Sequence, residues 1–138
     1  MKQVILIFCL IALGCASEKT SSENSEKARQ MFDAFNQHDW KGMSEFYAEP
    51  AQFLDPSFGT DYVAKTRNET VAKYQEMQAM FSDIHDEIVG MYASGDKVTV
   101  EFISTGTAPD STTFKLPIVA VLTFEDGLIV KDATYYDN

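Results

Sequence analysis

Cysteine and histidine are scarce in this sequence, which limits the chemistry available to it. The 138 residues include two cysteines, Cys9 and Cys15, and two histidines, His38 and His85. Zinc sites need several such ligands at short, regular spacings, and these four residues offer no such spacing. We therefore expect no metal site, and no motif in the chain indicates a cofactor.

Basic residues are also in the minority. Lys and Arg number 11 against 21 Asp and Glu, which gives a formal net charge of −10 at pH 7. A surface this acidic repels the phosphate backbone of nucleic acid. The charge therefore excludes nucleic acid as a partner, and we attribute the overall acidity to solubility rather than to a cationic partner.

The chain has no apolar run long enough to cross a membrane as a helix. Its longest run, residues 4–13, follows the single charge of Lys2, whereas a transmembrane helix needs about 20 residues. A positive charge before a short apolar core is typical of a secretory signal peptide. The alternative, a buried helix of the domain, is disfavoured because a helix that is apolar on every side does not suit a small domain.

The end of this apolar run, Ala12-Leu13-Gly14-Cys15, resembles the lipobox of bacterial lipoproteins. The resemblance implies that residues 1–14 are removed and that acyl chains on Cys15 hold the protein at a membrane. Ala16 is not the Asp typical of inner-membrane lipoproteins, so an outer-membrane or periplasm-facing location is favoured. With Cys9 removed and Cys15 lipidated, the mature domain would contain no disulfide.

The next residues, 16–25, are small and polar, which is typical of a flexible tether. We therefore expect three parts: a signal peptide over residues 1–14, the lipidated cysteine with its tether over 15–25, and one domain over 26–138. A domain of this length can build a single hydrophobic core.

Apolar periodicity predicts three helices in the first half of this domain. The apolar stripe within 28–35 indicates a helix over 23–37. Asp39 has the position of an N-cap for a second, short helix over 40–47. A third helix begins at Thr66, which has capping-box spacing with the glutamate three residues later.

Strand patterns dominate the second half of the domain. A short strand over 51–54 precedes a polar loop over 57–65. Four longer strands then form a meander joined by turns, over residues 84–92, 97–107, 113–124 and 128–136. This order of elements favours an α+β fold in which the helices cover one face of an antiparallel sheet.

One strand segment, 118–122, is apolar at every position. An antiparallel strand with one face in solvent would alternate between apolar and polar residues, so we expect its second face to be covered as well. We predict a homodimer that packs sheet to sheet. Cover by the protein's own tail or tether is the alternative.

Several short motifs together resemble those of one superfamily. They are Asn36-x-x-Asp39-Trp40-x-Gly42, Phe46-Tyr47-Ala48, Asp55-Pro56, the run 124–130 and Tyr135-Tyr136-Asp137. Over residues 26–137 the chain is similar to the nuclear-transport-factor-2-like superfamily, in particular its SnoaL-like and ketosteroid-isomerase-like branches. The resemblance implies a cone-shaped, curved antiparallel sheet packed on three N-terminal helices, with a pocket at the open end and dimerisation through the sheet.

The same resemblance suggests a catalytic residue. Ketosteroid isomerases carry an Asp base before a Pro at the end of the first strand, and Asp55 has that position. The oxyanion donors of that family are replaced here, the Tyr by Met31 and the protonated Asp by Val119 or Ala120. Such donors supply much of the catalytic effect, so steroid-type isomerisation is disfavoured. The alternative role of Asp55 is that of a turn and cap residue.

The resemblance also suggests which other residues line the pocket. They are Trp40, Met31, Phe53, Tyr74, Tyr47, His85, Tyr136 and Asp137. Core packing is the alternative role for Tyr47, and a place on the acidic surface is the alternative for His85. The pattern leaves open whether the strand face of Tyr136 or that of Asp137 lines the pocket.

Three functional hypotheses follow. The favoured one is a membrane-anchored domain that binds a small apolar or amphipathic molecule, because both oxyanion positions are lost. The second is a cofactor-free acid–base enzyme (an isomerase, cyclase, dehydratase or hydrolase) with Asp55 as its base. The third is a structural envelope protein that assembles through its sheet.

Overall fold

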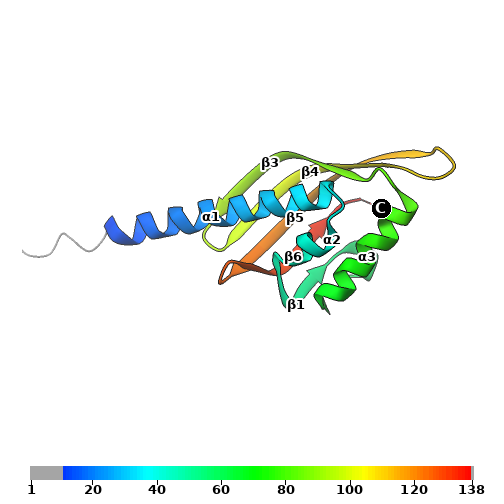
Figure 1. The fold of residues 1–138 in the computed structure, drawn as a ribbon. Coiled ribbons are helices and arrows are strands. Elements are labelled where there is room, and N and C mark those ends of the chain that lie inside the picture. The colour runs from blue at the N-terminus through cyan, green and yellow to red at the C-terminus, as the bar shows by residue number, and fades with distance from the viewer. Residues whose placement is uncertain (1–10, 138) are drawn as a thin grey trace, which may run out of the picture.

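The computed structural model describes the backbone of residues 11–137 and the side chains of residues 17–137. This part of the chain contains three α-helices and a 3-10 turn: α1 (Ile11–Asn36), α2 (Trp40–Ser44), η1 (Pro56–Phe58) and α3 (Arg67–Met80). It also contains six strands: β1 (Tyr47–Leu54), β2 (Val63–Lys65), β3 (His85–Ser94), β4 (Lys97–Thr107), β5 (Thr113–Glu125) and β6 (Leu128–Tyr135). Figure 1 shows α1 lying along β3 and β4, with α2 and α3 on the side of β1.

The strands form one open sheet in the order β2-β1-β6-β5-β4-β3. Its pairing register shifts at three places, in the β3–β4, β5–β6 and β1–β6 ladders. Extra residues of this kind bend a strand and increase its twist, which suits a sheet that curves around helices. The predicted α+β fold with a curved sheet is confirmed. One correction applies: β1 and β6 run parallel, so the sheet is not wholly antiparallel.

The core lies between α1 and the inner face of the sheet. The apolar stripe of α1 is buried as expected, and Phe32 meets Phe102 of β4 edge to face, with ring centroids 4.9 Å apart. On β5, Ala120, Leu122 and Phe124 point to the same interior. This packing supplies the stability that a helix of this composition would lack alone.

The tether predicted over 16–25 differs from the structure, where these residues belong to α1. Side chains of this part of α1 and of the next turn contact two strand turns. Asn24 is buried, Ser21 Oγ donates to Gly95 O at 3.4 Å, and Lys27 Nζ donates to Gly127 O at 2.8 Å. No helix within residues 11–137 is long and apolar enough to cross a membrane. Residues 1–10 of the expected signal peptide lie outside the described residues.

The region after α2 also differs from the prediction. The short helix expected over 40–47 ends at Ser44, and Tyr47 already begins β1. The backbone explains the early strand, because Ile129 N donates to Phe46 O at 2.8 Å and ties this segment to β6. The loop predicted over 57–65 contains η1 and the three-residue strand β2, which is too short to produce a visible alternation.

The apolar segment 118–122 has both faces partly covered. Ala120 and Leu122 point to the interior, whereas Val119 and Val121 of the outer face are half-buried. Near them Tyr135, the partner of Val119 in the β5–β6 ladder, is exposed. The homodimer stays a prediction.

Candidate functional site

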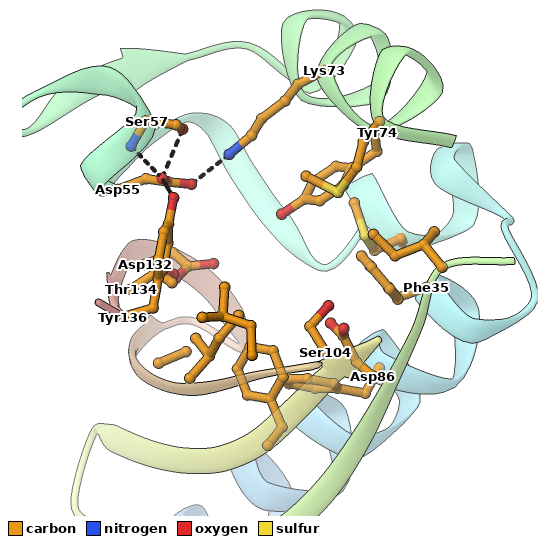
Figure 2. A pocket seen from close by; sticks show the side chains of 18 of the residues that line it. Phe35, Asp55, Ser57, Lys73, Tyr74, Asp86, Ser104, Asp132, Thr134 and Tyr136 are labelled. Carbon is orange, nitrogen blue, oxygen red and sulfur yellow. Dashed lines mark hydrogen bonds and ion pairs between the residues drawn. The ribbon is translucent and has the colours of Figure 1, made fainter. Parts of the chain in front are cut away.

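A cavity of about 430 Å³ lies between the inner face of the sheet and helices α1 and α3. Its walls are mostly apolar and aromatic, with Phe35, Phe102, Met77 and Leu122 among them. Polar groups project into it from separate elements, and Figure 2 shows that they point toward one another across the open space. Binding sites for small molecules commonly combine apolar walls with a few placed polar groups.

Asp55 lies at one end of the cavity, between β1 and η1. Its Oδ1 accepts hydrogen bonds from the backbone N and the Oγ of Ser57, at 2.8 and 2.7 Å, and from the Tyr136 hydroxyl at 2.9 Å. Its Oδ2 accepts from Lys73 Nζ of α3 at 2.5 Å. Asp55 therefore caps η1 and binds a lysine at the same time (Figure 2).

These contacts decide the charge state of Asp55. Burial alone would raise its pKa, but the hydrogen bond and charge of Lys73, together with the hydrogen bonds from Ser57, outweigh burial and lower the pKa. A general base works best with a pKa near the operating pH. A carboxylate with a lowered pKa, whose oxygens are already engaged, is poorly suited to take a proton from a substrate.

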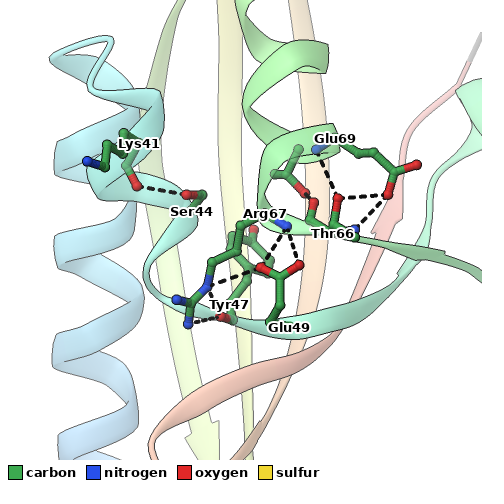
Figure 3. Close-up of polar contacts among 8 residues, drawn as sticks. Lys41, Ser44, Tyr47, Glu49, Thr66, Arg67 and Glu69 are labelled. Atoms are coloured by element: carbon green, nitrogen blue, oxygen red, sulfur yellow. Dashed lines mark hydrogen bonds and ion pairs between the residues drawn. The ribbon is translucent and has the colours of Figure 1, made fainter.

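The position of Lys73 is fixed through the start of α3. Arg67 donates from Nε and Nη2 to Tyr47 O, at 2.9 and 2.7 Å, which fastens the helix to β1 (Figure 3). Thr66 and Glu69 form the predicted capping box, with each side chain bonded to the other's backbone N–H. The first turn of α3 is thus anchored, which places Lys73 and Tyr74 on the cavity wall.

Asp132 of β6 is a second carboxyl on the wall and is only 6% exposed. The Tyr47 hydroxyl donates to its Oδ2 at 2.7 Å, and Thr134 Oγ1 donates to its Oδ1 at 3.1 Å. Burial raises the pKa of Asp132, and these hydrogen bonds with the charge of Lys73 only partly offset it. Burial and the nearby carboxyl of Asp132 also raise the pKa of Tyr47 well above its usual value, so Tyr47 stays protonated.

Asp86 of β3 is the third carboxyl, at the other end of the cavity beside Ser104 (Figure 2). It is 7% exposed, and within the described residues its Oδ1 has no hydrogen-bond partner. Asn36 fixes its backbone, donating to Asp86 O at 2.9 Å and accepting from Asp86 N at 2.8 Å. Burial raises the pKa of Asp86 to about 6, with a smaller opposite effect from Ser104.

The residues predicted for the pocket fall into two groups. Asp55, Met31, Tyr47, Tyr74 and Tyr136 line the cavity. The sequence did not decide which face of the last strand lines the pocket. In the structure it is the face that carries Asp132, Thr134 and Tyr136.

The other four predicted residues lie elsewhere. Trp40 is buried behind the wall and donates from Nε1 to Gln78 Oε1 at 2.7 Å. Phe53 lines a smaller neighbouring pocket beneath α3. His85 and Asp137 are exposed and do not line the cavity, because His85 points to the outer face of β3 and Asp137 follows the inward-facing Tyr136.

Sequence reasoning missed Lys73, Asp86 and Ser104. A signal for Asp86 was present, because Ile84, Asp86 and Ile88 alternate with the exposed residues between them. Lys73 carried no such signal, since its partner lies 18 residues away on another element. Within residues 11–137 no cluster of three or more His, Cys, Asp or Glu side chains is arranged to hold a metal.

Comparison with protein-family models matches residues 28–131 to the SnoaL-like domain. The chain belongs to the SnoaL-like domain family. Solved structures share its fold at low identity. A protein with a ketosteroid isomerase-like fold from Catenulispora acidiphila, solved with trimethylamine, has a TM-score of 0.72 at 21% identity, with 81% of this chain and 85% of that chain covered.

Two further structures extend the SnoaL-like comparison. A putative ketosteroid isomerase from Kribbella flavida has a TM-score of 0.72 at 20% identity, covering 89% of this chain and 82% of its own. IdmH, described as a putative polyketide cyclase from Streptomyces antibioticus, has a TM-score of 0.73 at 23% identity, covering 83% and 92%. No curated protein matches the chain. At these identities the structural likeness concerns the fold.

Proposed function

We propose that this SnoaL-like domain binds a small, largely apolar molecule in its central cavity. The observation that carries the proposal is the cavity itself, about 430 Å³ in volume, preformed, and walled by aromatic and aliphatic side chains with few polar groups. A structural neighbour has been solved with trimethylamine, which supports small-molecule binding in this fold.

The state of Asp55 favours binding over catalysis by that residue. Both of its oxygens are engaged, and its pKa is lowered rather than raised. The oxyanion donors expected of a ketosteroid isomerase are replaced by Met31, which here packs into the wall, and by apolar residues of β5. We therefore assign Asp55 a structural role that holds η1, α3 and the last residues of the sheet together.

A fluorescence experiment tests whether the cavity binds apolar molecules. The neutral probe N-phenyl-1-naphthylamine is expected to bind the domain at one equivalent with increased emission. Ala120→Phe, which fills the cavity from β5, should abolish this binding, whereas Val121→Phe, on the outer face of the same strand, should leave it unchanged. Absence of binding to the unaltered protein would refute the proposal, and so would equal binding by both variants.

We also propose that the protein is exported and anchored to the cell envelope through a lipid on Cys15, and that it forms a homodimer. The support for anchoring is the charged and apolar N-terminus followed by the lipobox-like Ala12-Leu13-Gly14-Cys15. The support for the dimer is the outer sheet face with its exposed Tyr92 and Tyr135. Incorporation of labelled fatty acid that is lost in Cys15→Ala tests the anchor, and sedimentation of the domain tests the dimer.

A further inference from the structure

The cavity wall carries more negative than positive charge. Three buried or half-buried carboxyls line it, Asp55, Asp86 and Asp132, and exposed Glu76 lies on the same wall. Among the described residues that line the cavity, Lys73 is the single cation. Its Nζ lies 2.5 Å from Asp55 Oδ2 and 4.3 Å from the centre of the Phe58 ring. Its charge is therefore already paired with that of Asp55.

The two remaining buried carboxyls differ in how they are satisfied. Asp132 accepts hydrogen bonds on both oxygens, from Tyr47 and Thr134, and the charge of Lys73 reaches it. The pKa of Asp86 is raised by burial and lowered to a smaller extent by the Ser104 hydroxyl, with no contribution from the charge of Lys73. The residue lines the cavity, and its Oδ1, buried beneath the wall, has no partner within the described residues.

A buried carboxylate without a partner is costly, and a cation or a strong hydrogen-bond donor removes that cost. Asp86 is also held in place, because Asn36 bonds to both its backbone N and its backbone O. These bonds fix the backbone position from which the carboxyl projects. Its neighbours on the cavity wall include Phe35 and Phe102, whose ring faces attract cations.

From this arrangement we infer that the Asp86 end of the cavity is a subsite for a protonated amine attached to an apolar body. The ammonium group donates to the Asp86 carboxyl and to the Ser104 hydroxyl, and the apolar part fills the aromatic space between α1 and the sheet. The inference rests on the proposed function, because it assigns the charge of the molecule that the cavity holds. It also excludes carboxylic acids, which Asp86 and Asp132 repel.

A matched pair of probes tests the inference. 2-Phenylethylamine and 2-phenylethanol have the same apolar body and differ in the charged group. By calorimetry at neutral pH, the amine is expected to bind the unaltered protein about tenfold more tightly than the alcohol, since hydrogen bonds to charged groups are worth this much. Asp86→Asn should remove this preference, so that the amine and the alcohol bind the variant equally. Asp61→Asn, an equal change of charge at an exposed residue outside the cavity, should preserve the preference.

The outcomes separate the inference from the proposed function. Equal binding of amine and alcohol by the unaltered protein overturns the amine subsite, and this comparison needs no variant to fold. Failure of both probes, while N-phenyl-1-naphthylamine still binds, overturns the subsite and leaves the proposed function standing. Failure of all three probes overturns both. An amine preference that persists in a folded Asp86→Asn variant also overturns the assignment to Asp86.

Discussion

The two ends of the cavity carry the same chemical group in opposite circumstances. At one end Asp55 accepts hydrogen bonds from Ser57, Tyr136 and Lys73, and its pKa is lowered. At the other end Asp86 is buried with an oxygen that has no partner in the described chain, and its pKa is raised to about 6. The comparison shows that the neighbours of a carboxyl, rather than its position in a family motif, decide its pKa and whether its oxygens have hydrogen-bond partners.

The largest effect on stability is expected at the Asp55 end of the cavity, from removal of the ion pair with Lys73. Lys73→Met leaves the Asp55 carboxylate largely buried without its cation, which we expect to lower the free energy of unfolding by about 3 kcal/mol, a value discounted for the partial exposure of the pair. Urea denaturation at neutral pH measures this loss. Asp55→Asn added to Lys73→Met should restore part of the stability, and a loss below about 0.5 kcal/mol for Lys73→Met alone would contradict the account.

At the Asp86 end of the cavity we expect a substitution to raise the free energy of unfolding rather than lower it. The folded-state pKa of Asp86, about 6, lies above its unfolded value, so ionisation destabilises the folded protein as pH rises from about 4 to above 6. Asp86→Asn should therefore stabilise the protein by about 2 kcal/mol above that range and by nothing near pH 4. Thermal unfolding across pH measures the difference, with Asp61→Asn as the control. A destabilised Asp86→Asn variant at neutral pH would count against the comparison.

A smaller effect is expected between the two ends, at Asp132. Tyr47→Phe removes the hydroxyl that donates to Asp132 Oδ2 at 2.7 Å, which we expect to cost about 1.5 kcal/mol because one buried acceptor loses its partner. The pKa of Asp132 should rise further, since that hydrogen bond lowers it. Tyr62→Phe, at an exposed tyrosine, serves as the matched control. Equal stability of the two variants would show that Asp132 does not need Tyr47.

The smallest effect is expected from Tyr136→Phe. The tyrosine donates one of several hydrogen bonds to Asp55, and Lys73 and Ser57 remain in place when it is lost. We therefore expect a loss of about 0.5 kcal/mol in unfolding free energy, near the lower end for a single hydrogen bond. A loss as large as that of Lys73→Met would mean that the Tyr136 hydroxyl stabilises the Asp55 carboxylate as much as the ion pair does.

Much of the fold could be predicted because it depends on local patterns. The apolar stripe of α1 and the alternation of β4 each report one buried face, and the capping box marks the start of α3. The helical state of residues 16–25 could not be read in this way, since these small and polar residues form no apolar stripe. The parallel β1–β6 pair likewise joins strands far apart in the sequence.

The candidate site was predictable only in part, for a related reason. Asp55, Tyr47 and Tyr136 were found through a family resemblance, which points to positions but not to charge states. The face of the last strand was ambiguous because pairing irregularities lie beside it, in both the β1–β6 and β5–β6 ladders. The ion pair between Asp55 and Lys73 arises from packing across elements, and the Asp-Pro motif gives no sign of it.

The difference between the two ends can be measured directly by carbon-detected NMR titration of the aspartate carboxyls. We expect Asp86 to titrate near pH 6 and Asp55 to titrate below its usual range in the same sample. Assignment follows from the loss of each signal in Asp86→Asn and Asp55→Asn. A common, ordinary pKa for both carboxyls, or a raised pKa at Asp55, would contradict the claim that one end of the cavity is closed by the protein and the other is open to a ligand.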